Sequence, residues 1–302
     1  MNICLEYMKK IKNYFSLIKF SHSIFAMPFA LIGFFLGVKS LESELITEPW
    51  YIQYGRLLIL VILCMVFARS AAMAFNRYLD RYFDAKNPRT AIREIPAGIL
   101  KANNVLFFTI VNCLLFITTC FFINKICFYL SPVALLVVLG YSFTKRFTPL
   151  CHLILGLGLS LAPIGAYLSV TGEFEWLPIL FSLTVFFWVS GFDIIYALQD
   201  EEFDKENKLF SIPAALGKQN ALSVSRLLHL LTSIVIIYAG WAGEFGMFYW
   251  TGAFIFIGML VYQQSVVKPN DLKRVNLAFM TSNGIASVVF AIFVITDLYF
   301  FK

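Results

Sequence analysis

The chain alternates between long apolar runs and short polar segments along its whole length. Nine runs stand out, at residues 17–39, 56–79, 104–123, 127–144, 150–170, 177–199, 220–240, 247–265 and 276–300. A run of about 17 to 25 apolar residues can cross the roughly 30 Å hydrocarbon core of a bilayer as a helix. Backbone polar groups inside lipid must find partners within their own segment, so each run is expected to be helical. The pattern predicts an all-α polytopic membrane protein with nine transmembrane helices.

The composition supports the same class. Of the 302 residues, 60% are hydrophobic and 14% are charged, so a soluble domain of this length would expose too much apolar surface to stay dispersed. The opening segment MNICLEYMKKIKNYF is too polar to be the apolar core of a cleavable signal, and the first apolar run is expected to be retained as a span. We therefore expect residues 1–302 to form a single membrane domain.

Charged residues between the runs are distributed asymmetrically. If the N-terminus is cytoplasmic, the inner segments carry most of the 24 Lys and Arg residues, and the 81–103 and 200–219 loops are both inner segments. On or near the outer side lie only Lys39, Arg56, Lys125 and Lys302. This positive-inside asymmetry predicts a cytoplasmic N-terminus in an inner (cytoplasmic) membrane, with both loops on the cytoplasmic face. The net charge of +6 is then a topology signal, and no nucleic-acid partner is indicated.

The polar stretch NRYLDRYFDAKN, residues 76–87, has a counterpart further along the chain. The sequence FDAKNPRTAIREIPAG starts at residue 83, and FDKENKLFSIPAALG starts 120 residues later. Asp80 and Asp84 are matched at the same offset by Asp200 and Asp204. The chain thus has an internal pseudo-repeat, with an acidic pair at the cytoplasmic end of the second span and another at that of the sixth.

The spacing within each acidic pair indicates a chemistry. Side chains at i and i+4 of a helix share a face about 6 Å apart, so Asp80 and Asp84 can converge on one small cation, with Asn76 one turn deeper. Asp200 and Asp204 repeat this arrangement. Hard oxygen ligands suit Mg²⁺, which often completes its coordination with substrate phosphates. One D-x-x-x-D at a helix end is commonly a solvated terminus, but two matched copies on one side favour a diphosphate site built on Mg²⁺.

Basic residues near the two acidic pairs are candidates for the remaining phosphate oxygens. They are Arg77, Arg81, Arg89, Arg93, Lys145 and Arg146.

Two charges lie deeper in the predicted spans. Arg69 precedes Asp80 by eleven residues and Asp193 precedes Asp200 by seven, which puts each on the helix face that carries the aspartates. A lone charge at such depth costs about 2.5 to 3.5 kcal/mol on insertion scales, so each needs a partner or a polar cavity. Two interpretations remain open. Arg69 and Asp193 form an ion pair between two helices, or they line a central polar cavity in which Arg69 receives an anionic group of a substrate.

Cysteine and histidine give little functional signal. The six cysteines form no C-x-x-C pair, and His22, His152 and His229 lie far apart with no metal-ligand spacing. We expect these residues to serve packing and helix-end polarity.

The two aspartate-rich stretches NRYLDRYFD and DIIYALQDEEFD resemble the paired motifs of the UbiA superfamily of intramembrane aromatic prenyltransferases, N-x-x-x-D-x-x-x-D and D-x-x-Y-A-x-x-D-x-x-x-D. The nine-span layout is also similar, so the resemblance covers nearly the whole chain. The stretches KFSHSIFAMPFA, ARSAAMAFNR and NPRTAIREIPAG resemble the 4-hydroxybenzoate polyprenyltransferase branch, and most closely its bacterial members linked to menaquinone formation by the futalosine route. One departure is Arg77, where many members have a further aspartate.

The resemblance implies Mg²⁺-dependent transfer of a polyprenyl group from polyprenyl diphosphate to a hydroxyarene carboxylate. The acceptor would be 4-hydroxybenzoate or a dihydroxynaphthoate, in ubiquinone or menaquinone biosynthesis. Tyr141 and Tyr196 are the preferred aromatic residues to shield an allylic cation. Lys19 falls where the family has a basic residue for aromatic carboxylate or diphosphate, although an interfacial lysine is an equally open interpretation. The metal ligands would be Asn76, Asp80, Asp84, Asp200 and Asp204.

The main alternative is a secondary transporter with an acidic intramembrane site. Internal repeats, acidic residues in spans and a polar cavity are also features of transporters. However, transporter sites lie near the midplane at broken helices, whereas these aspartates gather at one interface. The prenyl chain length, the acceptor and the oligomeric state cannot be read from the sequence.

Overall fold

The computed structural model describes residues 12–18, 25–41 and 50–300 of the chain. The described residues form helices and one isolated β-bridge but no β-strand, which confirms the all-α fold. The longer helices are α2 (Met27–Leu41), α3 (Trp50–Lys86), α4 (Ala102–Ile123), α5 (Lys125–Thr144), α6 (Cys151–Thr171), α7 (Trp176–Ala197), α9 (Ile212–Ala242), α10 (Met247–Val266) and α11 (Asn283–Phe300). Three short elements complete the order: the 3₁₀ turn η2 (Leu198–Asp200), α8 (Glu201–Glu206) and the π-helix η3 (Leu277–Ser282).

Seven helical segments of the described chain are long and apolar enough to cross a membrane. They comprise α3, α4, α5, α6, the stretch from α7 through α8, α9, and the stretch from η3 through α11. The prediction of a polytopic membrane protein is thereby confirmed. The first predicted span overlaps α2, a shorter apolar helix of 15 residues, and the eighth overlaps α10, with 20 residues. The count of nine spans and the cytoplasmic N-terminus stay predictions.

Asn124 separates α4 from α5 in extended backbone conformation. Its side chain accepts a hydrogen bond of 2.8 Å from the Cys127 amide, which caps α5, and donates one of 2.8 Å to the Leu168 carbonyl of α6. A side chain that satisfies the first orphan amides of a helix fixes where that helix begins. The predicted break between the third and fourth spans is therefore confirmed.

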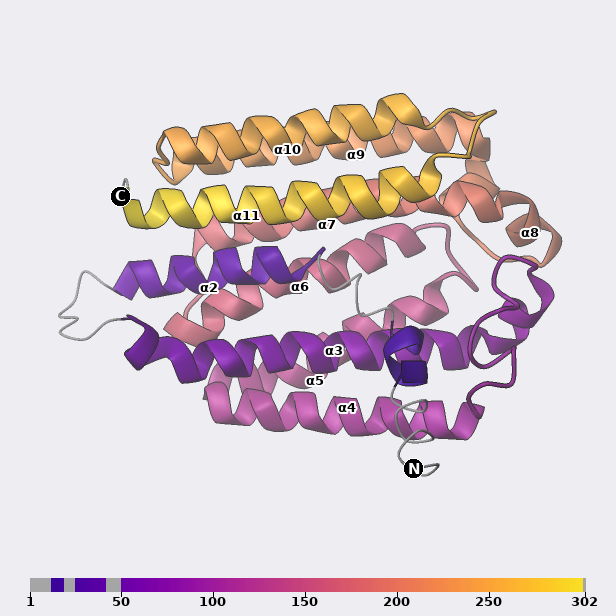
Figure 1. The fold of residues 1–302 in the computed structure, drawn as a ribbon, viewed down its shortest axis with the longest axis horizontal. Coiled ribbons are helices and arrows are strands. Elements are labelled where there is room, and N and C mark those ends of the chain that lie inside the picture. Colours follow the sequence, from indigo (N-terminus) through magenta and orange to yellow (C-terminus); the bar gives the residue numbers. More distant parts are fainter. Residues whose placement is uncertain (1–11, 19–24, 42–49, 301–302) are drawn as a thin grey trace, which may run out of the picture.

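The long helices lie side by side along the longest dimension of the molecule (Figure 1). The loop of residues 87–101 and α8 lie at the same end of the bundle, at the right in Figure 1, whereas the α9–α10 connection lies at the opposite end. The two polar loops that carry the repeat are thus at one end of the molecule, as the charge pattern predicts.

An aromatic core joins α2, α7, α10 and α11. The ring of Phe29 packs against Trp188, Phe256 and Phe290 at centroid distances of 5.4, 6.1 and 5.9 Å, and all four side chains are fully buried. Because lipid is as apolar as these side chains, close packing rather than exclusion from water holds such helices together. This aromatic core holds α7 in place through Trp188.

Close contact between α6 and α7 occurs at Gly156. A Cβ atom there would lie 2.2 Å from Ser190 Oγ and 2.6 Å from the Phe186 carbonyl oxygen, so a larger residue would push the helices apart. The two helices run antiparallel at this contact. For that reason His152, one turn before Gly156, lies beside Asp193, just after Ser190.

Candidate active site

A cavity of about 600 Å³ lies between α3, the 87–101 loop, the α5–α6 connection and α7. It brings together most of the residues that the sequence singles out: Arg69, Asn76, Arg77, Asp80, Asp84, Arg89, Arg93, Tyr141, Lys145, Arg146, Asp193, Tyr196 and Asp200. The predicted polar cavity is therefore present. Asp204 lies behind its wall and is 0% exposed. Lys19 lies outside the described residues.

The first acidic pair projects from the last two turns of α3, which continues to Lys86, beyond the predicted end of the span. Asn76 donates a hydrogen bond of 3.0 Å to Asp80 Oδ2, and Arg146 contacts Asp80 Oδ1 at 3.0 Å. Asp84, one turn further, forms an ion pair of 2.6 Å with Arg93 from the loop. The i, i+4 geometry predicted for this pair is thus realised on one continuous helix.

The second acidic pair has a different backbone. The α-helix ends at Ala197, and a 3₁₀ turn then leads to Asp200, so Asp200 precedes α8 while Asp204 lies within it. The expectation that both project from one uninterrupted α-helical face is wrong. Asp200 is held by Arg89, which donates from both Nε and Nη2, and by Asn87 at 3.1 Å.

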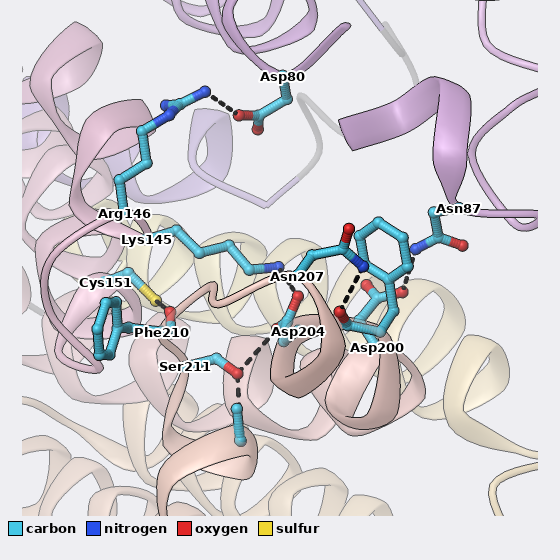
Figure 2. Close-up of polar contacts among 12 residues, drawn as sticks. Asp80, Asn87, Lys145, Arg146, Cys151, Asp200, Asp204, Asn207, Phe210 and Ser211 are labelled. Carbon is cyan, nitrogen blue, oxygen red and sulfur yellow. Dashed lines mark hydrogen bonds and ion pairs between the residues drawn. The ribbon is translucent and has the colours of Figure 1, made fainter. Parts of the chain in front are cut away.

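Asp204 is held at the other side of α8. Lys145 Nζ lies 2.8 Å from Asp204 Oδ1, and Ser211 donates a hydrogen bond of 2.9 Å to Oδ2 (Figure 2). In Figure 2 Lys145 reaches Asp204 from the α5–α6 connection, while the neighbouring Arg146 points to Asp80. Two consecutive basic residues therefore contact one aspartate from each acidic pair.

Every aspartate of the two pairs thus has one basic partner, and the partners come from two loops. The pairs are Asp80–Arg146, Asp84–Arg93, Asp200–Arg89 and Asp204–Lys145. Truncating one member of such a buried pair leaves an uncompensated charge, which is costly. A ligand that combines metal cations with an anion, such as a metal diphosphate, supplies new partners for both kinds of residue: the metal binds the aspartates, and the phosphate oxygens bind the basic side chains.

The pKa values of the two cations outside the spans follow from this pairing. Burial alone lowers the pKa of Lys145, but the charge of Asp204 and the hydrogen bond to it outweigh burial, so the pKa lies above its usual value. Burial likewise lowers the pKa of Arg89, and its hydrogen bonds and ion pair with Asp200 more than offset the effect. Both side chains therefore stay charged at neutral pH and can bind phosphate oxygens.

The side chains fit Mg²⁺ as a ligand set. No group of three or more His, Cys, Asp or Glu in the described part of the chain is close enough to hold an ion by itself. Mg²⁺, however, is commonly bound by one or two carboxylates together with substrate phosphates and water. Asp84 Oδ2 is buried and lacks a hydrogen-bond partner among the described residues, so a carboxylate oxygen remains available on the cavity wall. Asn76 and the aspartates would complete this set of hard oxygen donors.

Arg69 lies on α3 at the deep end of the cavity, away from the aspartates, and Arg77 lies about two turns nearer to them. Nε of Arg69 and Nε of Arg77 are buried, and neither has a hydrogen-bond partner within the described ranges. Asp193 does not pair with Arg69, because the α6–α7 contact brings His152 to it instead, with Nδ1 2.7 Å from Asp193 Oδ2. Of the two interpretations left open by the sequence, the Arg69–Asp193 ion pair is not formed, whereas both residues line one polar cavity.

Aromatic rings line the cavity between its acidic and deep ends. The Tyr196 hydroxyl accepts a hydrogen bond of 2.9 Å from Arg89, whose guanidinium lies 5.2 Å from the centre of the Tyr196 ring. On the other side Phe279, from the π-helix η3, packs against the Tyr196 ring at 4.3 Å. Tyr141 lines the cavity from α5. Such faces can shield a cationic carbon from water.

A second, apolar cavity of about 390 Å³ adjoins the first. The two cavities share five wall residues: Arg69, Met73, Tyr141, Leu155 and Leu159. Residues of α3, α4, α5 and α6 form most of the remaining lining, and most of them are aliphatic or aromatic. An apolar chain attached to a group in the first cavity can therefore extend into the second.

Several site residues escape the sequence analysis. Asn87 is signalled by the repeat, because Asn207 occupies the matching position. His152, Ser211 and Phe279 carry no such signal, since their contacts depend on how distant helices pack. Arg81 does not line the cavity, contrary to expectation. It is held by its own helix, donating a hydrogen bond of 2.6 Å to the carbonyl of residue 78 and stacking on the tyrosines at 78 and 82.

Comparison with known proteins agrees with this geometry. The sequence model described as "UbiA prenyltransferase family" matches residues 26–285. The chain is similar to the 4-hydroxybenzoate octaprenyltransferase of Tolumonas auensis, with 31% identity over 235 residues that cover 78% of this chain and 82% of the relative. A protein of the same name from Aeromonas hydrophila is 29% identical over 80% of this chain and 84% of its own length.

Solved structures show the same fold. A UbiA homologue from Aeropyrum pernix K1 in its apo form superposes with a TM-score of 0.74, at 27% identity over 90% of this chain and 95% of that chain. A UbiA homologue from Archaeoglobus fulgidus, bound to DMAPP and Mg²⁺, gives a TM-score of 0.72 at 21% identity, covering 95% and 99%. The helical arrangement is therefore shared almost from end to end.

Proposed function

Because the chain belongs to the UbiA prenyltransferase family and is a polyprenyltransferase, we propose that it transfers a polyprenyl group from polyprenyl diphosphate to a hydroxyarene carboxylate in a Mg²⁺-dependent reaction. The observation that carries this proposal is the group of four aspartate–base ion pairs at one end of a cavity, in which every member except Asp204 lines the cavity wall. Equal numbers of acidic and basic side chains suit a metal diphosphate, because this ligand carries both positive charge, on the metal, and negative charge, on the phosphates. The relatives named 4-hydroxybenzoate octaprenyltransferase support the choice of acceptor.

The diphosphate end of the donor would lie between the two acidic pairs. Asp80 and Asp84 approach it from α3 and Asp200 from η2, with Asn76 one turn deeper; Asp204, behind the wall, would turn toward it when Lys145 moves to phosphate. When bound, Mg²⁺ supplies Lewis-acid stabilisation of the departing diphosphate. The cations released from the aspartates then hold phosphate oxygens by charge-assisted hydrogen bonds: Arg89, Arg93, Lys145 and Arg146.

The acceptor would lie at the deep end. Arg69, whose Nε has no hydrogen-bond partner in the described part of the chain, receives the carboxylate of the acceptor, and Asp193 accepts a hydrogen bond from the acceptor hydroxyl. Arg77 would lie between the acceptor and the diphosphate, at the position where many family members have an acid. A ring carbon attacks the first carbon of the prenyl chain as the bond from that carbon to the diphosphate oxygen breaks. The ring carbon then loses its proton to the released diphosphate, which restores the aromatic ring. Tyr196 and Tyr141 shield the positive charge that develops there.

The polyprenyl chain would occupy the apolar cavity. Its walls meet the polar cavity at Arg69, Met73, Tyr141, Leu155 and Leu159, so the reacting carbon would lie where the two cavities join. Longer chains continue between helices into lipid. We place the site on the cytoplasmic side of the inner membrane, where the positive-inside pattern orients the 81–103 and 200–219 loops. Lys19 remains a candidate for either substrate.

The experiment uses membranes that contain the full chain. They are incubated with a polyprenyl diphosphate and labelled 4-hydroxybenzoate or a labelled dihydroxynaphthoate, with Mg²⁺ or with a chelator, and lipophilic product is extracted. We expect Mg²⁺-dependent product with one of the two acceptors, and the preferred acceptor decides between a ubiquinone and a menaquinone route. Asp80→Ala and Asp200→Ala are expected to lower the rate at least about 100-fold.

If the protein forms no product with either acceptor, the proposed function is refuted. It is also refuted if Asp80→Ala and Asp200→Ala form product at the wild-type rate. Ion-coupled uptake of a solute into vesicles in that case would favour the transporter alternative.

A further inference from the structure

His152 is a buried titratable residue that no step of the reaction above uses. It lies in the first turn of α6, is 2% exposed, and stands on the wall of the deep end of the cavity. Both ring nitrogens have partners. Nδ1 lies 2.7 Å from Asp193 Oδ2, and Nε2 accepts a hydrogen bond of 3.3 Å from the Ile212 amide.

These two contacts fix the tautomer. The Ile212 amide can only donate, so Nε2 carries no proton, and Nδ1 must carry the proton of a neutral imidazole. Nδ1 therefore donates to Asp193 Oδ2 and leaves the carboxylate ionised. The other oxygen, Oδ1, has no partner among the described residues, and the Asp193 side chain is 22% exposed on the cavity wall. The imidazole thus holds one carboxylate oxygen in place and leaves the second for a ligand.

Through its Nε2 atom, the same imidazole is hydrogen-bonded to a segment that lies beside the diphosphate end of the site. Ile212 follows Ser211, whose hydroxyl donates to Asp204 and accepts from the Ala214 amide at the start of α9. Phe210, which precedes Ser211, donates a hydrogen bond of 2.7 Å from its amide to the Lys145 carbonyl. The Cys151 thiol lies 3.6 Å from the Phe210 carbonyl oxygen (Figure 2). Hydrogen bonds therefore hold residues 210–212 between the α5–α6 connection and α8.

We propose that His152 is a positioning residue for the acceptor: it orients Asp193 so that Oδ1 faces the acceptor hydroxyl, and it ties that carboxylate to the segment that holds Asp204. The inference rests on the proposed function, because it presumes an acceptor hydroxyl at the deep end. Without the Nδ1 proton, Asp193 can rotate or pair with Arg69, which lines the same cavity, and the acceptor loses its hydrogen bond. The donor site keeps its own ion pairs, so its affinity is unaffected.

A purely structural role makes a different prediction. If His152 only joined α6, α7 and α9, its loss would lower stability and reduce the affinities for donor and acceptor together. A positioning role changes the acceptor KM alone and is rescued by a side chain that still donates to Asp193. Asparagine is such a side chain, since its amide nitrogen lies at about the distance of Nδ1 from the backbone.

The test compares purified His152→Ala and His152→Asn with the wild type and with His229→Asn. His229 is the matched control, because it is also a buried helical histidine with a hydrogen-bonded Nδ1, to Gln264, but it does not line the cavity. The readouts are the KM for hydroxyarene carboxylate, the KM for polyprenyl diphosphate, kcat and the thermal midpoint. We expect His152→Ala to raise the acceptor KM about 10- to 100-fold. The donor KM should change by less than about twofold, and His152→Asn should recover most of the loss.

Equal changes in both KM values, or no rescue by asparagine in a protein that melts like the wild type, would overturn the proposal. So would an unchanged acceptor KM in His152→Ala. A binding measurement separates this failure from failure of the proposed function. Thermal stabilisation by 4-hydroxybenzoate or a dihydroxynaphthoate, without donor, should occur in the wild type and in His229→Asn and be lost in His152→Ala, even if no product forms. If neither acid stabilises the wild type, the acceptor site itself is refuted, and the role of His152 with it.

Discussion

Arg69 offers the sharpest perturbation of the acceptor site. Its Nε is buried with no hydrogen-bond partner among the described residues, and Asp193 pairs with His152 instead of with Arg69, so the guanidinium can donate to an incoming carboxylate. We consider Arg69→Met, because methionine keeps most of the apolar stem and removes the guanidinium. Arg69→Lys keeps the charge but loses the planar pair of donors that matches a carboxylate.

The expected magnitude follows from the contact that is lost. A hydrogen bond to a charged group contributes about 1.5–3 kcal/mol, and each 1.4 kcal/mol is about a factor of ten, so kcat/KM for a carboxylated acceptor should fall about 10- to 150-fold in Arg69→Met. The lysine variant should lose less. The KM for the prenyl donor should stay within about twofold, since the donor is held by cations on the two loops.

The assay is a double-mutant cycle with the substrate as the second partner. Wild type and Arg69→Met are measured with 4-hydroxybenzoate and with 4-hydroxybenzamide, which has nearly the same shape but no charge. The coupling between arginine and carboxylate is the loss with the acid that does not appear with the amide. If the variant loses the same factor with both acceptors, Arg69 does not bind the carboxylate and the assignment of the deep end is refuted.

Three further predictions test other parts of the site. Arg146→Ala should raise the KM for the prenyl donor about 10- to 100-fold, whereas Arg81→Ala, whose side chain stacks on its own helix, should change it by less than about twofold; similar effects would contradict the contacts described. Gly156→Ala places a Cβ atom 2.2 Å from a serine hydroxyl of α7 and should destabilise the protein by about 1–3 kcal/mol in a thermal unfolding experiment, while Gly165→Ala on the same helix, with nothing within 4 Å, should not. The pKa of Lys145 in the folded protein lies above its ordinary value, so Lys145 is fully charged below that ordinary value and loses its charge only as the pH rises through the raised pKa. The affinity for the prenyl donor should therefore be constant from about pH 7 to 9. A fall in affinity over this range that Lys145→Arg abolishes would show that the pKa of Lys145 is lowered instead.

The sequence predicts one half of the site well, for a local reason. Asp80 and Asp84 are four residues apart within a helix, so their common face follows from helical geometry alone. The 120-residue repeat locates the second pair and Asn87 in the same way. The helical spans are equally accessible, since their apolar length reflects the thickness of a bilayer.

The remainder depends on packing between distant segments. Which cation pairs with which aspartate is decided by the 87–101 loop and the α5–α6 connection, and neither carries a periodic signal. The sequence leaves open whether Arg69 pairs with Asp193, and the structure decides against it because the close α6–α7 contact at Gly156 gives Asp193 another partner, His152. The helix α7 ends at Ala197, two residues before the end of the predicted span, and Asp200 therefore lies on a 3₁₀ turn.

The central claim is that a metal diphosphate replaces four internal ion pairs, and binding tests it without turnover. Purified protein is titrated by calorimetry with a thiolo analogue of polyprenyl diphosphate that does not react, in Mg²⁺ or in chelator, for the wild type, Asp84→Asn and Arg81→Ala. We expect the wild type and Arg81→Ala to bind the analogue only when Mg²⁺ is present, and Asp84→Asn to lose most of that affinity. Equal binding by the wild type in Mg²⁺ and in chelator, with Asp84→Asn indistinguishable from it, would contradict the account.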